Sequence, residues 1–145
     1  MVDVSSKKVT SRKAVAAGTV VITPQIARAI RENSVAKGNV LEVARIGAIQ
    51  AAKRTSELIP LCHPIPLSNI AVHFELKGNK IVITAEATAE AKTGVEMEAL
   101  TAVSAAALII YDMCKALDKG IVITEIELLE KSGGKSGIYR RGAKK

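Results

Sequence analysis

Four charged side chains flank the apolar middle of one segment, residues 94–119 (GVEMEALTAVSAAALIIYDMCKALDK). Glu96 and Glu98 stand near its start, and Asp112 and Lys115 stand near its end. Carboxylates and an amine held at fixed geometry can exchange protons with a substrate. Asp112 and Lys115 are three positions apart, which lets their side chains meet on a helix. The segment therefore predicts acid–base chemistry, although charged helix ends that merely suit the helix dipole remain an alternative.

The spacing of Glu98 and Asp112 predicts where they would act. At about 100° per residue they lie about 40° apart around a helix axis, so they share a face. At about 1.5 Å per residue they also lie roughly 21 Å apart along that axis, too far for one small substrate to touch both. An antiparallel copy of the helix would bring the Glu98 end of one chain beside the Asp112 end of another. This geometry predicts a site shared between subunits.

His63 lies in a loop, LIPLCHPIPLS, whose prolines exclude regular structure. A rigid loop can hold a titratable imidazole at fixed geometry, as catalysis requires. A lone histidine is nevertheless more often structural, and that alternative stays open. Its neighbour Cys62 does not form a nucleophile–base pair with it, because consecutive side chains diverge. We interpret Cys62 as structural.

Several lysines could neutralise an anion. Lys131 and Lys135 frame the stretch KSGGKSG, whose exposed N–H groups can meet phosphate oxygens. The stretch does not match the phosphate-loop motif, because Leu129 stands where that motif needs its first glycine. Lys37, next to Gly38, could also reach a phosphate. A solvated tail and an ordinary surface lysine are the alternatives, and composition alone favours the tail.

The segment that carries the four charged residues has the composition of a long helix. It contains no proline and consists mostly of strong helix formers. Thr93 and Glu96 predict a capping box at its start, and Gly120 predicts a left-handed residue after its end. The middle, 102–110, is apolar or small all round, which predicts burial on more than one side. One side would lie on the chain's own sheet, and the other would contact a second subunit.

Shorter patterns surround this helix. They predict strands at 14–23, 70–77, 80–88 and 121–129, and helices at 24–33 and 40–58. Merging the two early helices gives the order βαββαβ. This is an α+β, ferredoxin-like arrangement with a four-stranded antiparallel sheet and helices on one face. The whole chain, 1–145, is predicted to be a single domain, with 1–13 and 132–145 flexible.

The two early helices carry signals of their own. Thr23 followed by Pro24 predicts the cap and first turn of the helix at 24–33. In the helix at 40–58, Gly47 falls on the apolar stripe and should allow close packing there. That stripe is formed by Val40, Val43, Ala44, Ala51 and Leu58.

Composition narrows the class of partner. The net charge of +7 favours nucleic acid, a membrane surface or a small polyphosphate. Aromatic residues make up only 2 % of the chain, which argues against base stacking on single-stranded nucleic acid. The two cysteines are far apart and make neither a disulfide framework nor a zinc site. Neither a signal peptide nor an apolar run of about 18 residues is present, so a cytoplasmic protein without a membrane span is predicted.

The chemistry of these residues alone predicts an enzyme or a binding protein that acts on a small phosphorylated compound. Two other classes of function remain open. A basic nucleic-acid-binding module would need aromatic residues on the sheet, where only Phe74 falls in a predicted strand. The other is a structural oligomer without catalysis, and the buried helix alone would be enough for that role.

Four stretches together resemble the cyclic pyranopterin monophosphate synthase family of molybdenum-cofactor biosynthesis. They are MVDVSSK, ARIGAIQAAKRTSELIPLCHP, KTGVEMEALTAVSAAALIIYDMCKA and LLEKSGGKSG. The resemblance implies a lyase that converts 3′,8-cyclo-7,8-dihydroguanosine 5′-triphosphate to cyclic pyranopterin monophosphate and releases pyrophosphate. It also implies a homohexamer, a trimer of dimers joined through the long helices, with the active site at the dimer interface.

The resemblance further implies which residues are catalytic. Asp112 would be the acid/base, and Lys115 beside it would exchange protons with its pKa lowered by a partly dry site. His63 and Lys131 would complete the catalytic set. No resident metal or cofactor is implied, and whether Mg²⁺ accompanies the triphosphate stays open.

The resemblance also implies a substrate-binding set. Its members are Asp3, Arg12, Lys37, Leu61, Cys62, His63, Glu96, Met97 and Glu98. A glutamate carboxylate matches the paired N–H edge of a guanine-like ring. Lys37, Lys131 and Arg12 would neutralise the triphosphate. A functional Asp3 would mean that the N-terminal arm folds over the site.

Overall fold

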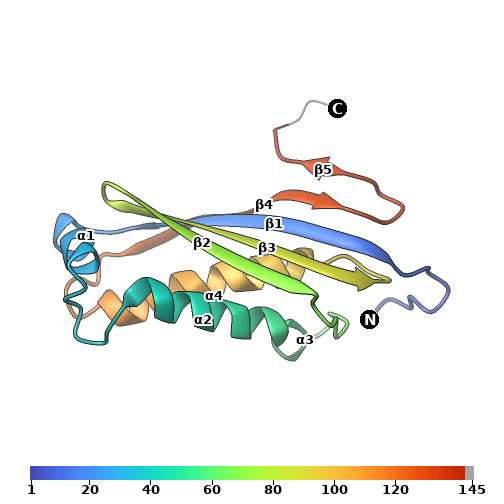
Figure 1. The fold of residues 1–145 in the computed structure, drawn as a ribbon, viewed down its shortest axis with the longest axis horizontal. Helices are drawn as coiled ribbons and strands as arrows, with labels where there is room; N and C mark the ends of the chain where they lie inside the picture. The colour runs from blue at the N-terminus through green and yellow to red at the C-terminus, as the bar shows by residue number, and fades with distance from the viewer. Residues whose placement is uncertain (143–145) are drawn as a thin grey trace.

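The computed structural model describes residues 1–142. The last three positions of the predicted flexible segment 132–145 lie outside the described residues. The elements follow the chain in the order β1 (Thr10–Val21), α1 (Pro24–Arg31), α2 (Val40–Lys53), α3 (Thr55–Leu58), β2 (Asn69–Lys77), β3 (Lys80–Ala91), α4 (Glu96–Cys114), β4 (Val122–Ser132) and β5 (Tyr139–Arg140) (Figure 1).

The strands form one five-stranded sheet in the order β2-β3-β1-β4-β5. All four neighbouring pairs are antiparallel, so the fold is α+β. The predicted count of four strands is wrong, because the chain turns back after β4. Tyr139 and Arg140 then pair with Lys131 and Glu130 as a short edge strand. The order of the four long strands is consistent with a ferredoxin-like arrangement.

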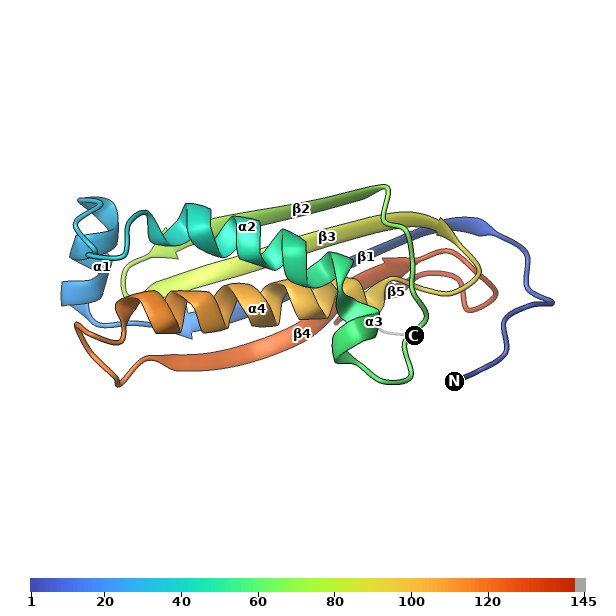
Figure 2. The same cartoon turned by 90° about the horizontal axis from the view of Figure 1, so that it is seen from below.

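Helices α2 and α4 lie side by side on one face of the sheet (Figure 2). The interior between them is aliphatic and rich in alanine. Gly18 lets α4 approach β1 closely, because a Cβ there would lie 2.6 Å from Cγ1 of Val103. Gly47 does the same for α2 and α4, since a Cβ there would overlap Cδ1 of Ile109. The predicted close packing at Gly47 is thus confirmed, with α4 as the neighbour.

The apolar middle of α4 is covered mainly by its own chain. The sheet covers one side, and α2 covers a second side, for which the sequence predicts a second subunit. Ala102, Ala106 and Ile110 are fully buried in this way, whereas Leu108 stays exposed. The all-round apolar pattern therefore does not by itself require a partner chain.

Several helices and strands begin or end at residues other than those predicted. Strand β1 begins at Thr10, inside the segment expected to be irregular. The predicted helix 40–58 is broken at Arg54 into α2 and α3. On the predicted apolar stripe of that helix, Val43 and Leu58 are exposed. The cap predicted at Thr23 is confirmed, since its side chain accepts a hydrogen bond from the Ile26 N–H.

The predicted ends of the long helix are wrong. Helix α4 spans Glu96–Cys114, and Val95 is its N-cap residue without a side-chain hydrogen bond. Thr93 therefore forms no capping box, and the Glu96 carboxylate instead lies against Gly94. Gly120 does not have a positive φ. The chain leaves the helix through a turn, and the Gly120 N–H donates to Asp118 Oδ1 at 2.6 Å.

Among the described residues, α4 alone has the length and apolar composition of a membrane-crossing helix. Half of its most apolar window is buried inside the fold, as in the core helix of a globular domain.

Candidate active site

Helix α4 carries candidate residues at both ends. Glu96, Met97 and Glu98 form its first turn, and Asp112 belongs to its last turn. Lys115 is the residue directly after the helix, at its C-cap. The helix is continuous between the two groups, so at about 1.5 Å per residue Glu98 and Asp112 are roughly 21 Å apart along its axis. The candidate residues on α4 therefore form two separate groups, and we refer to each group as a candidate half-site.

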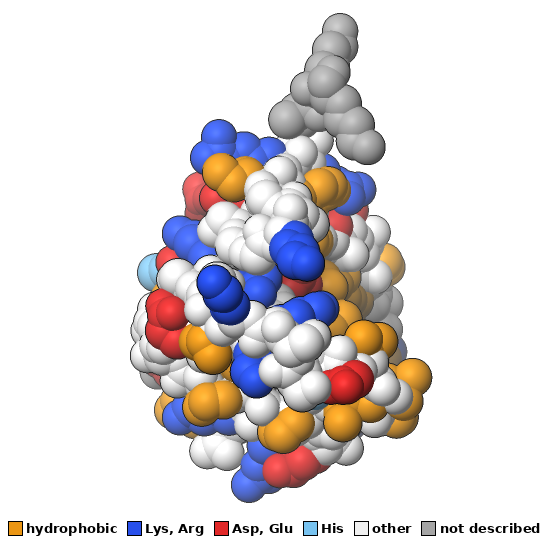
Figure 3. All heavy atoms as spheres, turned by 90° about the vertical axis from the view of Figure 1, so that its right-hand side faces the viewer, with side chains coloured by type: hydrophobic (Ala, Val, Ile, Leu, Met, Phe, Trp, Pro, Cys, Tyr) orange, Lys and Arg blue, Asp and Glu red, His pale blue; other side chains and the backbone are white. Residues whose placement is uncertain are grey.

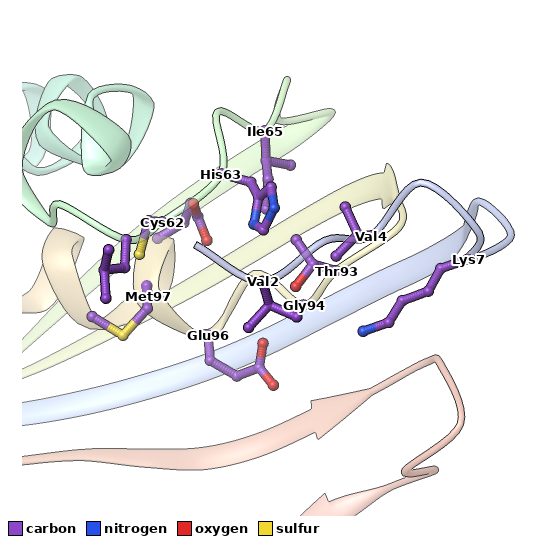
Figure 4. A pocket seen from close by; sticks show the side chains of 12 residues that line it. Val2, Val4, Lys7, Cys62, His63, Ile65, Thr93, Gly94, Glu96 and Met97 are labelled. Carbon is purple, nitrogen blue, oxygen red and sulfur yellow. The ribbon is translucent and has the colours of Figure 1, made fainter.

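The half-site at the start of α4 surrounds a cavity of about 380 Å³, which we call the front cavity. Its walls come from three segments that are distant in the sequence: the N-terminal arm, the proline-rich loop and the start of α4 (Figure 4). The lining residues are Val2, Val4, Lys7, Leu61, Cys62, His63, Ile65, Thr93, Gly94, Glu96, Met97 and Glu98. The structure thus brings together six of the residues predicted to bind substrate: 61–63 and 96–98.

Among the charged residues of this half-site, Glu98 is the one that is buried. Only 3 % of its surface is exposed, and its Oε2 atom has no hydrogen-bond partner. Burial raises the pKa of Glu98 above its ordinary value, and the nearby Glu96 carboxylate raises it further. A position in the first turn of a helix favours the anion, but here desolvation is the larger effect. The surroundings of Glu98 therefore favour the neutral carboxyl more than those of an exposed glutamate do.

The proline-rich loop contributes Cys62 and His63, both half-buried. Burial raises the pKa of the Cys62 thiol, and the Glu98 carboxylate adds to that effect. A thiol of raised pKa is a poor nucleophile, which supports the structural interpretation of Cys62. His63 points into the front cavity in Figure 4. Its side chain also lines a neighbouring cavity of about 490 Å³ that lies under the N-terminal arm.

The N-terminal arm lies across this end of the molecule. Val2, Val4 and Lys7 reach the front cavity. Asp3 lines the neighbouring cavity instead, together with Lys92. The pKa of Asp3 is lowered mainly because its carboxylate accepts a hydrogen bond from the Ser5 N–H, at 2.8 Å. Lys92 fastens the arm by donating from Nζ to the Ser5 carbonyl at 2.9 Å.

The half-site at the other end of α4 centres on Asp112. Its Oδ1 lies 2.7 Å from Lys115 Nζ, and its Oδ2 lies 2.5 Å from Lys37 Nζ. Hydrogen bonds from Lys115 and Lys37 lower the pKa of Asp112 to about 2. The contact predicted between Asp112 and Lys115 is confirmed, whereas the sequence assigns Lys37 only to the phosphates and does not reveal it as a partner of Asp112. Its position 75 residues away gives no local signal.

One expectation for this half-site needs correction. The Asp112 side chain is 53 % exposed, so the pair is not in a dry environment in the single chain. The pKa of Lys115 is raised, not lowered, because the hydrogen bond to Asp112 stabilises the ammonium form and desolvation is small. Beside the charged cluster lies a mainly apolar hollow of about 650 Å³. It is lined by Lys37, Val43, Leu108, Ile109, Asp112 and Met113.

Arg12 and Lys131 lie on neighbouring strands and line neither the front cavity nor the Asp112 hollow. Arg12 donates from Nε to the Ala91 carbonyl at 3.2 Å and from Nη2 to the Lys92 carbonyl at 3.3 Å. Lys131 contacts the Ser136 hydroxyl across the glycine-rich loop.

The glycine-rich loop closes over Arg12. A Cβ at Gly134 would overlap the Arg12 guanidinium, and Gly133 has a φ of +97°. Arg12 therefore fixes the loop against the end of β3. Figure 3 views this end of the molecule and shows Lys and Arg side chains spread over it. A surface of this charge suits a phosphorylated ligand.

No group of three or more His, Cys, Asp or Glu side chains that could hold a metal ion occurs within residues 1–142.

The chain is similar to known proteins of one family. Residues 1–134 match the model of the MoaC family. The chain is 52 % identical over 147 aligned positions to a cyclic pyranopterin monophosphate synthase of Bacillus cereus (strain B4264), covering 99 % of this chain and 91 % of the relative. It is also 52 % identical over 145 positions to the proteins of the same name from Bacillus thuringiensis (strain Al Hakam) and Bacillus anthracis (strain CDC 684 / NRRL 3495). In both comparisons the match covers 97 % of this chain and 90 % of the relative.

Proposed function

Because the chain belongs to the MoaC family, we propose that it acts as a cyclic pyranopterin monophosphate synthase in molybdenum-cofactor biosynthesis. The enzyme is a lyase that rearranges 3′,8-cyclo-7,8-dihydroguanosine 5′-triphosphate to cyclic pyranopterin monophosphate and releases pyrophosphate. The observation that carries the proposal is similarity at 52 % identity over nearly the full chain to proteins of that name.

The reaction opens and re-forms heterocyclic rings, so it needs positioned proton donors and acceptors. We assign proton transfer to Asp112 and Lys115, whose side chains already share a hydrogen bond. In the single chain this pair is exposed, and both members are stabilised in their charged forms. Removal of water by a substrate and a second protomer would add a desolvation cost to the Lys115 ammonium, which acts to lower its pKa against the attraction of Asp112.

Substrate binding is assigned to the front cavity. The Glu98 carboxylate would accept the paired N–H groups of the guanine-derived ring, and His63 would contact the ring from the proline-rich loop. Lys37 and Lys131 would neutralise the triphosphate and the departing pyrophosphate. Because the Arg12 N–H groups already donate to main-chain carbonyls, we assign Arg12 the role of holding the glycine-rich loop in place.

The complete site requires two protomers. We infer a dimer in which the α4 helices run antiparallel, so that the front cavity of one chain faces the Asp112 cluster of the other. Val43, Ile46 and Leu108 support this arrangement, because these large apolar side chains are exposed on α2 and α4. Three such dimers would make the hexamer. We further propose a ferredoxin-like subunit, a cytoplasmic location and no resident cofactor; any Mg²⁺ would arrive with the triphosphate.

The proposal is tested by incubating the purified protein with the cyclic dihydro-GTP compound and assaying both products. Pyrophosphate and cyclic pyranopterin monophosphate should form in equal amounts. Protein carrying Asp112→Asn is the control for contaminating phosphatases, since it should release neither product. If the wild-type protein consumes no substrate, or releases phosphate without the pterin, the proposed activity is wrong.

A further inference from the structure

A second cavity lies behind the front cavity, and we call it the rear cavity. Its volume is about 290 Å³, and it is enclosed by the end of α2, by α3 and by the proline-rich loop. It is lined by Ala52, Lys53, Thr55, Ser56, Pro64, Ile65, Pro66 and Glu98. Lys53 is exposed at its edge, so the rear cavity opens to solvent at that side.

Two side chains form the wall between the cavities. Among the lining residues, only Ile65 and Glu98 belong to both the front and the rear cavity. Ile65 is a hydrocarbon and cannot carry a proton. Glu98 is almost completely buried, and its Oε2 has no partner. The wall therefore contains one ionisable group, and one of its oxygens is buried without a hydrogen-bond partner.

The surroundings of Glu98 favour its protonated form in the empty site. Burial is the main cause of its raised pKa, and the Glu96 carboxylate acts in the same direction. The other titratable groups that line the two cavities are Lys7, Cys62 and His63 in front and Lys53 behind. None of these forms a hydrogen bond or ion pair with the Glu98 carboxyl in the described structure.

We propose that Glu98 holds a proton in the empty site and releases it through the rear cavity when substrate fills the front cavity. This inference rests on the proposed function, because it needs a ligand whose paired N–H groups demand a carboxylate. The step is a simple ionisation: the carboxyl group loses one proton to water in the rear cavity and becomes the anion that accepts both N–H groups. When product leaves, the carboxylate takes one proton back along the same path.

The rear cavity would give the proton of Glu98 a path that bound substrate does not block. Bound substrate closes the front of Glu98, so a proton released on that side would be trapped next to the reacting ring. The rear cavity gives the proton a separate exit to solvent past Ser56 and Lys53. Proton release would thereby be coupled to recognition of the ring, without disturbing the Asp112–Lys115 pair at the other half-site.

The number of protons released can be measured by calorimetric titration with the cyclic dihydro-GTP compound in buffers of different ionisation enthalpy. Asp112→Asn protein is used so that substrate binds without turnover. We expect up to about one proton released per site at pH values below the raised pKa of free Glu98, with the number falling as pH rises through that pKa. Adding Glu98→Gln should abolish the release, whereas Glu57→Gln, a change at an exposed residue of α3 that lines neither cavity, should preserve it. Unchanged release after Glu98→Gln would overturn the proposal.

The route is tested separately by the rate of release, followed with a pH indicator in rapid mixing. Ser56→Leu narrows the rear cavity, and Ser56→Ala is the matched control that does not. We expect Ser56→Leu to slow release several-fold without changing the number of protons, and Ser56→Ala to leave both unchanged. Equal rates in the two variants would exclude the rear cavity as the exit. This pair also tests the proposal if Glu98→Gln proves poorly folded.

Failure of this inference and failure of the proposed function have different signatures. Wild-type protein that releases no pyrophosphate contradicts the function itself. Wild-type protein that turns over normally, but binds substrate without proton release that depends on Glu98, contradicts only the role assigned to the rear cavity.

Discussion

Glu98 and Asp112 lie at opposite ends of one continuous helix, 14 residues apart (112 minus 98). Glu98 is buried beside the front cavity, and Asp112 is exposed between two lysines. About 21 Å of helix separates them, so a single copy of the chain cannot place both on one small substrate. A second copy that runs in the opposite direction can, and catalysis is therefore expected to need two protomers.

Replacing Asp112 by Asn should remove catalysis and preserve the fold. The carboxylate is exposed, so its loss leaves no buried group unpaired. We expect kcat for pyrophosphate release to fall by about 10²–10⁴-fold, the range typical of a lost general acid or base. The unfolding midpoint and the oligomeric state should not change. A variant that retains more than half of the wild-type rate would remove Asp112 from the mechanism.

Replacing Glu98 by Gln should stabilise the protein at high pH. The pKa of Glu98 is raised in the folded state, so its contribution to stability is complete below the ordinary value of 4.5 and is lost as pH rises through the folded value. Glutamine has no such penalty. The thermal midpoint of Glu98→Gln, relative to wild type, should therefore increase between about pH 4 and pH 8. A constant difference across this range would contradict the raised pKa.

The packing of α4 on β1 is tested at Gly18. A Cβ at this position would lie 2.6 Å from Cγ1 of Val103, which is fully buried and cannot move freely. Gly18→Ala should lower the free energy of unfolding by about 1–3 kcal/mol through overpacking, more than the roughly 0.5–1 kcal/mol gained by removing a glycine from a strand. Adding Val103→Ala should recover part of the loss. Additive effects in the double mutant, measured by denaturant unfolding, would argue against this contact.

Lys131 should act on the phosphates. Its ammonium group contacts the neutral Ser136 hydroxyl, so its charge is available to an anion. Lys131→Met should lower kcat/KM by about 10–100-fold and flatten its dependence on salt. Lys77→Met is the control, because Lys77 ends β2 and its charge is already paired with Glu75 at 2.8 Å. An unchanged salt dependence in Lys131→Met would separate this residue from the triphosphate.

Local signals in the sequence identify much of this fold. Thr23-Pro24 marks a helix start by chemistry confined to a few residues, and the alternation in 70–77 identifies β2. The capping box predicted at Thr93 is wrong because Glu96 turns toward Gly94, a tertiary detail that residue spacing does not contain. The short strand β5 is not predicted because two residues carry no usable periodicity.

The candidate site, like the fold, can be predicted from the sequence only where its residues are close together in the chain. The residues of each half-site are close in sequence, which makes 61–63, 96–98 and Asp112 with Lys115 visible as groups. The link between Lys37 and Asp112 depends on how α2 and α4 pack, so no motif reports it. Coverage of α4 by α2 also shows why the apolar pattern alone does not establish a subunit interface: a helix that is apolar on two sides can bury both within one chain.

The central claim, a site built from two protomers, is tested most directly by mixing two inactive variants. Glu98→Gln protein and Asp112→Asn protein are unfolded together, refolded and assayed for pyrophosphate release. In a mixed dimer one site keeps the native Glu98 of one chain and the native Asp112 of the other, so random pairing should restore about one quarter of wild-type activity. If the mixture is as inactive as each variant alone, although mixed dimers have formed, each chain holds its own complete site and the shared site is wrong.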